Sequence, residues 1–215
     1  MRTPSAPTIA IAAGIAAMAI AFISNAGAQQ SEPEVENPKA LTSVAFAGGC
    51  FWCVEADFDK VEGVVETISG YTGGELANPT YKQVSKTETG HYEAVKVTFD
   101  PELVSYDTLV EYFFRHVDPT DADGQFCDRG DSYRTAIFVA NDEQRSIAEE
   151  EIAEINAAGI LGQPVVTPVL HADTFWPAED YHQNYYKKNA LKYRFYRASC
   201  GRDGRIEDLW GDVSH

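Results

Sequence analysis

Segments with strand-like and helix-like hydrophobic patterns alternate along residues 42–191, so the chain must pack helices on a sheet. Strands are predicted at residues 42–47, 64–71, 92–99, 134–140 and 165–170, the last interrupted by Pro168. Helices are predicted at about 50–60, at 106–117 after a Ser105 cap, at 142–158 after an Asn141 cap, and at about 178–191. Several strands have one polar face. The pattern predicts an α+β fold, a single two-layer domain with a mixed β-sheet and packed helices.

The first 28 residues have the features of a secretory signal peptide. Arg2 supplies the positive charge, residues 9–23 form an apolar run, and Ala26-Gly27-Ala28 is a small-residue cleavage site. The run is short for a bilayer span, which favours cleavage over anchoring. Residues 29–40 are polar and predict a flexible leader. We expect a folded domain at 41–193 and a C-terminal tail at 194–215 in a protein exported to the bacterial periplasm.

The charge of the chain limits its partners. Thirty-three acidic residues outnumber 17 basic ones, for a net charge of −16. A protein this acidic is repelled by nucleic acid and by anionic membrane surfaces, so neither is expected as a partner. The hydrophobic content of 44% is that of a globular protein. We expect it to act as a monomer with no membrane contact after signal cleavage.

Four cysteines follow the leader: Cys50, Cys53, Cys127 and Cys200. An even count in an exported protein suggests disulfides, but a chain of this length does not need them to fold. A bridge between Cys50 and Cys53 would close a loop too short to stabilise much. The close pair therefore suggests redox chemistry. No metal site is predicted, because a lone CxxC supplies only two ligands and no His pair has finger-like spacing.

Cys50 is predicted to lie where a strand gives way to a helix. The unpaired N–H groups of a helix start favour a thiolate, and Gly48 and Gly49 permit a tight turn before it. These features predict an activated cysteine rather than an inert one in the core. Phe51 and Trp52 could wall an apolar pocket for a methyl or thioether group, although aromatic residues at such a corner are usually core.

Glu93 falls on the apolar face of the strand at residues 92–99, together with Val95 and Val97. A carboxyl group in that position should have a raised pKa and be protonated near neutral pH. It could then donate a proton to an oxygen that becomes basic during a reaction. A strand-end Glu that reaches solvent or pairs with an Arg fits the pattern equally well.

Several blocks, in order from about residue 42 to 190, resemble the A-type peptide-methionine (S)-S-oxide reductases. The blocks are Gly49-Cys50-Phe51-Trp52, Gly70-Tyr71-Thr72-Gly73-Gly74, Asn78-Pro79-Thr80-Tyr81, Thr89-Gly90-His91 with Glu93-Ala94-Val95, Tyr133-Arg134-Thr135-Ala136-Ile137 and Ala178-Glu179-Asp180-Tyr181-His182-Gln183. The resemblance implies a ferredoxin-like fold and an oxidoreductase that uses a disulfide as acceptor.

The resemblance also implies roles for individual residues. Cys50 would attack the sulfoxide sulfur and become a sulfenic acid, and Glu93 would protonate the sulfoxide oxygen. Tyr81 and Tyr133 would hydrogen-bond that oxygen. Phe51 and Trp52 would hold the methyl group, and Asp128 would line the pocket. A second thiol would form a disulfide with Cys50, which an external thioredoxin-like dithiol reduces, with no bound cofactor. The substrate would be the S epimer of methionine sulfoxide, free or in proteins.

The chain departs from the commonest family pattern at its other cysteines. Cys53 replaces a Gly, Cys127 replaces an Asn, and residues 195–215, with one Cys200, replace a Gly-rich tail with recycling cysteines. Cys200 and Cys53 are nearly equal candidates for the resolving thiol. Cys127 is third and is more readily interpreted as structural.

Two other functions fit parts of the sequence. A thioredoxin-like disulfide oxidoreductase would explain the CxxC and a Val166-Thr167-Pro168 loop of the cis-proline kind, but not the segments around Glu93 and Tyr81. A disulfide-stapled binding module would explain the even number of cysteines.

Overall fold

The computed structural model describes Met1 and residues 40–211. Apart from Met1, the predicted signal peptide lies outside the described residues, as does the leader up to residue 39. Residues 40–211 fall within one compact unit. No helix in this described part has the length and apolar character needed to span a membrane.

A six-stranded mixed sheet forms the centre of the fold, in the order β7-β6-β1-β3-β2-β8. Its strands are β1 (Thr42–Gly48), β2 (Val64–Thr72), β3 (Tyr92–Phe99), β6 (Thr135–Val139), β7 (Val169–His171) and β8 (Trp176–Pro177). β6 and β7 are parallel, and the other neighbours are antiparallel. A separate hairpin joins β4 (Gly124–Gln125) to β5 (Asp128–Arg129). The mixed sheet confirms the predicted α+β class.

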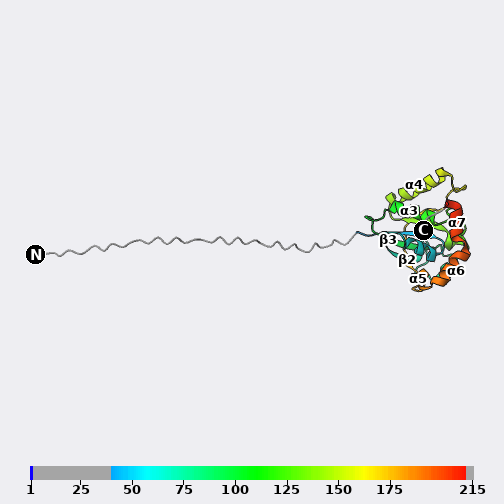
Figure 1. The fold of residues 1–215 in the computed structure, drawn as a ribbon. Helices are drawn as coiled ribbons and strands as arrows, with labels where there is room; N and C mark the ends of the chain where they lie inside the picture. The colour runs from blue at the N-terminus through cyan, green and yellow to red at the C-terminus, as the bar shows by residue number, and fades with distance from the viewer. Residues whose placement is uncertain (2–39, 212–215) are drawn as a thin grey trace. The chain divides into compact units, whose positions relative to one another are not determined.

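The helices are α1 (Phe51–Phe58), α2 (Tyr81–Val84), α3 (Tyr106–Arg115), α4 (Asp142–Ala158), α5 (Tyr185–Lys188), α6 (Ala190–Cys200) and α7 (Arg202–Trp210), with a short 3-10 helix at Asp131–Tyr133. α3 and α4 lie side by side (Figure 1). Both predicted caps are confirmed: Ser105 Oγ accepts from the N–H of Thr108, and Asn141 Oδ1 accepts from that of Gln144. α4 ends at Gly159, which adopts the left-handed conformation that favours glycine.

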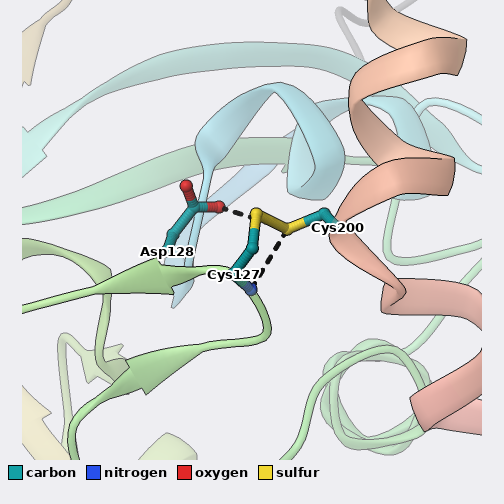
Figure 2. A group of neighbouring side chains, drawn as sticks. All are labelled: Cys127, Asp128 and Cys200. Carbon is teal, nitrogen blue, oxygen red and sulfur yellow. Dashed lines mark hydrogen bonds between the residues drawn. A yellow bond between two sulfur atoms is a disulfide. The ribbon is translucent and has the colours of Figure 1, made fainter.

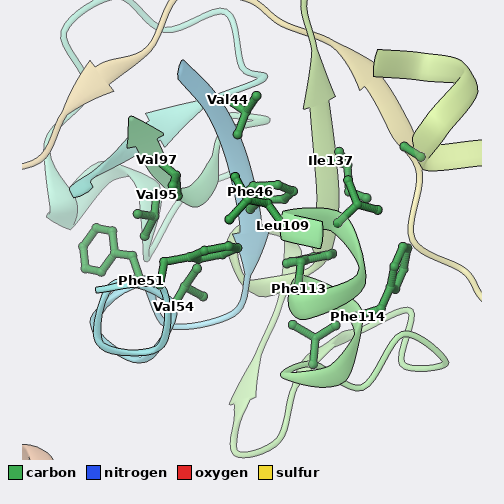
Figure 3. Packing of buried hydrophobic residues seen from close by; sticks show 14 of the residues in the cluster. Val44, Phe46, Phe51, Val54, Val95, Val97, Leu109, Phe113, Phe114 and Ile137 are labelled. Carbon is green, nitrogen blue, oxygen red and sulfur yellow. The ribbon is translucent and has the colours of Figure 1, made fainter. Parts of the chain in front are cut away.

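The main core lies between one face of the sheet and the helices (Figure 3). Phe46 on β1 stacks on Phe58 of α1 and Phe113 of α3, with ring centroids 4.9 Å and 5.1 Å apart. Val95 and Val97 of β3 are fully buried in the same cluster. The opposite face of β3 contributes Tyr92 and Ala94 to a smaller cluster. The two faces of β3 therefore separate as the alternation predicted, with Glu93 on the side of the main core.

Two predicted elements are wrong in extent. The strand at 165–170 is reduced to β7, because Pro168 has no N–H to donate to a ladder. The helix at 178–191 begins only at Tyr185, after Asn184 in a left-handed conformation with φ 54°. The Gln183 side chain instead bonds the backbone of Ser69 on β2, with Ser69 N–H donating to Oε1 at 3.0 Å and Nε2 donating to Ser69 O at 2.8 Å.

The segment predicted to be a tail with little periodicity forms α6 and α7. The buried side chains of these two helices include Tyr193, Arg197, Arg202 and Ile206, so their inward face is partly charged. A hydrophobic pattern cannot reveal a face of that kind. Gly201, with φ 73°, makes the turn between the two helices.

Candidate active site

Cys50 stands at the turn between β1 and α1, as predicted. Gly49 precedes it with φ 82°, and a Cβ on Gly49 would lie 2.6 Å from Gln125 Cβ, so glycine is required there. Cys50 is the N-cap residue of α1, and its carbonyl accepts from the N–H of Cys53 at 3.0 Å. Cys50 and Cys53 are both free and buried, 6% and 2% exposed. The first turn of α1 thus carries two thiols in the protein interior.

Glu93 places a carboxyl group against this helix start. It is 1% exposed, and its Oε2 accepts from the N–H of Phe51 at 3.1 Å. Its Oε1 has no hydrogen-bond partner among the described residues. Burial raises the pKa of Glu93 to about 8, opposed by the bond from Phe51. Glu93 is therefore neutral at pH 7, as its place on the apolar face predicted.

The side chains predicted for the site line one small cavity of about 50 Å³. Its lining residues are Cys50, Phe51, Trp52, Tyr81, Glu93, Asp128, Tyr133 and Tyr196. One water needs roughly 10–15 Å³, so the cavity has room for a group of a few heavy atoms. Tyr81 and Tyr133 both line the cavity, and burial raises the pKa of both phenols. Both phenols are therefore neutral donors at the cavity.

Trp52 forms the aromatic wall of the cavity. Its ring stacks on Tyr185 with centroids 3.7 Å apart and planes 8° apart. Its indole N–H donates to Nδ1 of His182 at 3.0 Å, so the His182 hydrogen is on Nε2. Burial lowers the pKa of His182 and keeps the ring neutral. His182 belongs to one of the blocks that resemble the family, but no role was predicted for it. Tyr185 was not predicted as a site residue.

Tyr196 of α6 is a site residue that the sequence did not indicate. Its hydroxyl donates to Oδ2 of Asp128, and the residue lines the same cavity as Cys50. Its ring meets Trp52 edge-on, with centroids 5.8 Å apart. The only available signal was the cluster of tyrosines near the C-terminus, which carries no spacing typical of a site.

The prediction that the helix start makes Cys50 acidic is wrong for the free site. Burial raises the pKa of Cys50 well above its usual range, and Cys53 and Glu93 add to the rise. Cys53 shifts the other way, because its hydrogen bond with Cys50 and the charges of Arg202 and Arg197 lower its pKa against burial. Of the two thiols, Cys53 is the one that ionises more easily.

Cys127 and Cys200 form a disulfide, with their Cα atoms 5.0 Å apart (Figure 2). It ties the end of α6 to the β4–β5 hairpin, so Cys200, one of the two leading candidates for the resolving thiol, is not a free thiol here. The Cys200 sulfur lies 3.9 Å from Oδ2 of Asp128, which places the disulfide beside the cavity. Cys127, Asp128 and Cys200 are close enough together to suggest a metal site, but the disulfide occupies both sulfurs.

Two free, buried thiols one helical turn apart can pass between thiol and disulfide, which is the chemistry of cysteine-based oxidoreductases. Comparison with known proteins identifies the family within this class of oxidoreductases. Residues 42–213 match the family described as peptide methionine sulfoxide reductase, and the chain belongs to that family.

Individual relatives agree with this assignment. MsrA 2 of Rhizobium meliloti is 58% identical over 170 residues, which cover 79% of this chain and 84% of that protein. The MsrA/MsrB protein of Vibrio cholerae is 53% identical over 77% of this chain, which spans only 44% of that protein's length. The structure of methionine sulfoxide reductase A of Corynebacterium diphtheriae aligns with a TM-score of 0.64 and 34% identity, covering 73% of this chain and 78% of that one.

Family membership overturns both rival interpretations. The loop at Val166-Thr167-Pro168 also lacks the cis-proline that a thioredoxin-like fold would have there. No peptide bond of the described residues, including that before Pro168, is cis. The binding-module interpretation leaves Cys50 and Cys53 unexplained, because both are free.

Proposed function

We propose that the chain reduces the S epimer of methionine sulfoxide, free or in proteins, with Cys50 as the nucleophile. One observation carries the proposal: Cys50 and Glu93, whose Oε1 has no hydrogen-bond partner among the described residues, line the same small cavity together with Phe51 and Trp52. The apolar wall suits the methyl group. The neutral carboxyl and the phenols of Tyr81 and Tyr133 suit the sulfoxide oxygen.

The first step transfers oxygen from the substrate to the enzyme. Glu93 donates its proton to the sulfoxide oxygen, which makes the sulfur electrophilic, and Cys50 attacks that sulfur. The thiol proton of Cys50 replaces the one that Glu93 gave up. The attack forms a bond between the two sulfur atoms. The hydroxyl group then passes to the Cys50 sulfur as the substrate S–O bond and the new S–S bond both break, so methionine leaves and Cys50 is oxidised to a sulfenic acid. Both partners start neutral, so the buried site gains no net charge.

Cys53 then resolves the sulfenic acid. It is free and lies one helical turn from Cys50, whereas Cys127 and Cys200 are bonded to each other. A Cys50–Cys53 disulfide forms and water leaves. An external thioredoxin-like dithiol restores the two thiols, and no bound cofactor takes part.

The cellular setting is part of the same proposal. The signal-peptide pattern of residues 1–28 supports export to the bacterial periplasm, where the enzyme would act as a monomer to repair proteins damaged by oxidative stress. A disulfide between Cys127 and Cys200 suits an oxidising compartment.

A thiol mass map after a single turnover tests the roles of the cysteines. The enzyme is first treated so that only Cys50 and Cys53 are free, then mixed with one equivalent of methionine S-sulfoxide. We expect one methionine per enzyme and a Cys50–Cys53 disulfide. Cys53→Ser should stop at the Cys50 sulfenic acid, and Cys200→Ser should still form the Cys50–Cys53 bond. A Cys50–Cys200 bond in the wild type would contradict the proposal.

A further inference from the structure

A buried cluster of charges lies behind Cys53, away from the substrate cavity. Asp57 follows Cys53 by one turn of α1 and is 1% exposed. Arg197 of α6 donates from Nη1 to Oδ1 of Asp57 at 2.8 Å. Arg202 of α7, 2% exposed, has its Nε 3.8 Å from Oδ2 of the same carboxylate. Two guanidinium groups therefore share one buried carboxylate.

The positive charge of this cluster is only partly compensated. The other hydrogen bonds of Arg202 go to neutral carbonyls, Gly48 O at 3.1 Å and His116 O at 2.8 Å, and its Nε has no hydrogen-bond partner. Arg197 also pairs with Asp203, but that carboxylate is 49% exposed and is screened by water. Among the fully buried groups, two positive charges face one negative charge.

Cys53 lies next to this cluster and is exposed to its excess positive charge. Residues four apart on a helix lie on the same face, so Cys53 and Asp57 point to the same side of α1. Cys53 packs with Tyr193 of α6, and Tyr193 Oη accepts from Arg197 at 3.0 Å. The thiol therefore lies among the groups that hold the two arginines, out of contact with water.

We propose that Arg197 and Arg202 are positioning residues that hold Cys53 as the thiolate for its attack on the Cys50 sulfenic acid. This inference rests on the proposed function and adds the origin of the resolving nucleophile. In the step, the Cys53 thiolate forms the S–S bond and the S–O bond of Cys50 breaks. The oxygen leaves as hydroxide and is protonated to water, so the sulfenic sulfur is reduced as the thiolate is oxidised.

The other titratable groups around Cys53 act in different directions. Asp57 on α1 disfavours negative charge on the thiol, whereas Glu93 on β3 is neutral at pH 7 and adds no charge there. Burial raises the pKa of Tyr193, which stays neutral. Cys50 favours ionisation of Cys53 through its hydrogen bond. The two arginines are thus the cations of the cluster, and α6 and α7 bring both of them to the site.

The test measures the resolution step alone, in the full-length enzyme, as a function of pH. Methionine S-sulfoxide is mixed with reduced enzyme, methionine release is followed by rapid quench, and disulfide formation is followed by mass spectrometry of the quenched samples. Arg197→Gln removes one cation and Asp57→Asn removes the carboxylate. Arg205→Gln is the matched control, because Arg205 also lies on α7 but pairs with Asp118 at 2.7 Å.

Opposite shifts are expected from the two cluster variants. Arg197→Gln should slow resolution about tenfold at pH 7 and move its profile to higher pH, Arg197→Lys should restore most of the rate, and Asp57→Asn should move the profile to lower pH. Methionine release and the Arg205→Gln profile should not change. A merely structural role would move both variants in the same direction or slow both steps together, and either result would overturn the inference.

Two further outcomes are decisive. If neither cluster variant folds, the wild-type profile decides: a midpoint below the ordinary thiol value of about 8.5 supports the inference, and one at or above that value overturns it. If Cys53→Ser still closes a disulfide on Cys50, the proposed function itself is wrong about the resolving thiol, whatever the arginine variants do.

Discussion

The backbone N–H of Phe51 donates to Oε2 of Glu93 over 3.1 Å, which joins the start of α1 to the middle of the sheet. The bond orients the carboxyl so that its other oxygen, Oε1, remains unpartnered. Because Phe51 directly follows Cys50 in the sequence, the bond also holds the Glu93 carboxyl group next to Cys50. The proton donor and the sulfur nucleophile of the proposed reaction are therefore held by the same turn of backbone.

Methionine formation should depend on the protonated form of Glu93. The pKa of Glu93 is about 8, so the single-turnover rate should be constant at lower pH and fall about tenfold per pH unit above 8. Glu93→Gln keeps an acceptor for the Phe51 N–H but cannot give up a proton. It should lower the rate about a hundredfold or more and abolish the fall above pH 8. A wild-type rate that rises steadily through pH 9 would contradict this role.

Ionisation of Glu93 should also make the free energy of unfolding depend on pH. Its pKa rises from 4.5 to about 8 on folding, so the folded state binds its proton more tightly, and stability from this group is lost as pH rises between those values. Glu93→Gln removes the effect. The free energy of unfolding of the variant, relative to wild type, should rise by a few kcal/mol, as an order of magnitude, from pH 4.5 to 8. Urea titrations at both pH values measure it; equal differences would show that Glu93 ionises freely.

The disulfide between Cys127 and Cys200 should stabilise the fold without taking part in turnover. It joins residues 73 apart in sequence, so its loss should lower the free energy of unfolding by about 2–4 kcal/mol. Cys127→Ala with Cys200→Ala removes it cleanly. Repeated turnover with a dithiol should continue in this double variant and stop in Cys53→Ser. Loss of turnover in the double variant, measured where it remains folded, would assign the pair a catalytic role.

The hydroxyl of Tyr196 should contribute to the rate more than to binding. Tyr196→Phe removes the bond to Asp128 and the hydroxyl at the cavity that Cys50 lines, but keeps the ring that meets Trp52 edge-on. We expect kcat to fall about tenfold, equivalent to one good hydrogen bond, with little change in KM. Steady-state kinetics on a methionine sulfoxide peptide separates the two. A rise in KM alone would make Tyr196 a substrate contact.

The sequence predicted the elements whose buried faces are apolar. The spacing of Leu109, Phe113 and their neighbours marked α3, and the alternation around Val95 marked β3 and put Glu93 on the inner face. It failed for α6 and α7, because Arg197 and Arg202 are buried by pairing with Asp57, and a hydrophobic pattern registers such residues as surface.

The site was predicted in the same uneven way. The site residues on or next to β1, α1 and β3 were predicted. Tyr185 and Tyr196, which contact Trp52, were not, because the pattern indicated one helix at 178–191 and a tail from 194 where the structure has α5 and α6. Nor could spacing show that Cys127 pairs with Cys200, since the approach of the β4–β5 hairpin to α6 is a tertiary contact.

The most direct test of the central claim is the rate at which purified Cys50→Ser converts methionine S-sulfoxide to methionine. Serine keeps the shape of the N-cap but lacks a sulfur that can accept oxygen as a sulfenic acid. The account predicts no detectable methionine, while Cys53→Ser still yields one equivalent per enzyme. A folded Cys50→Ser variant that forms methionine at the wild-type rate would contradict it.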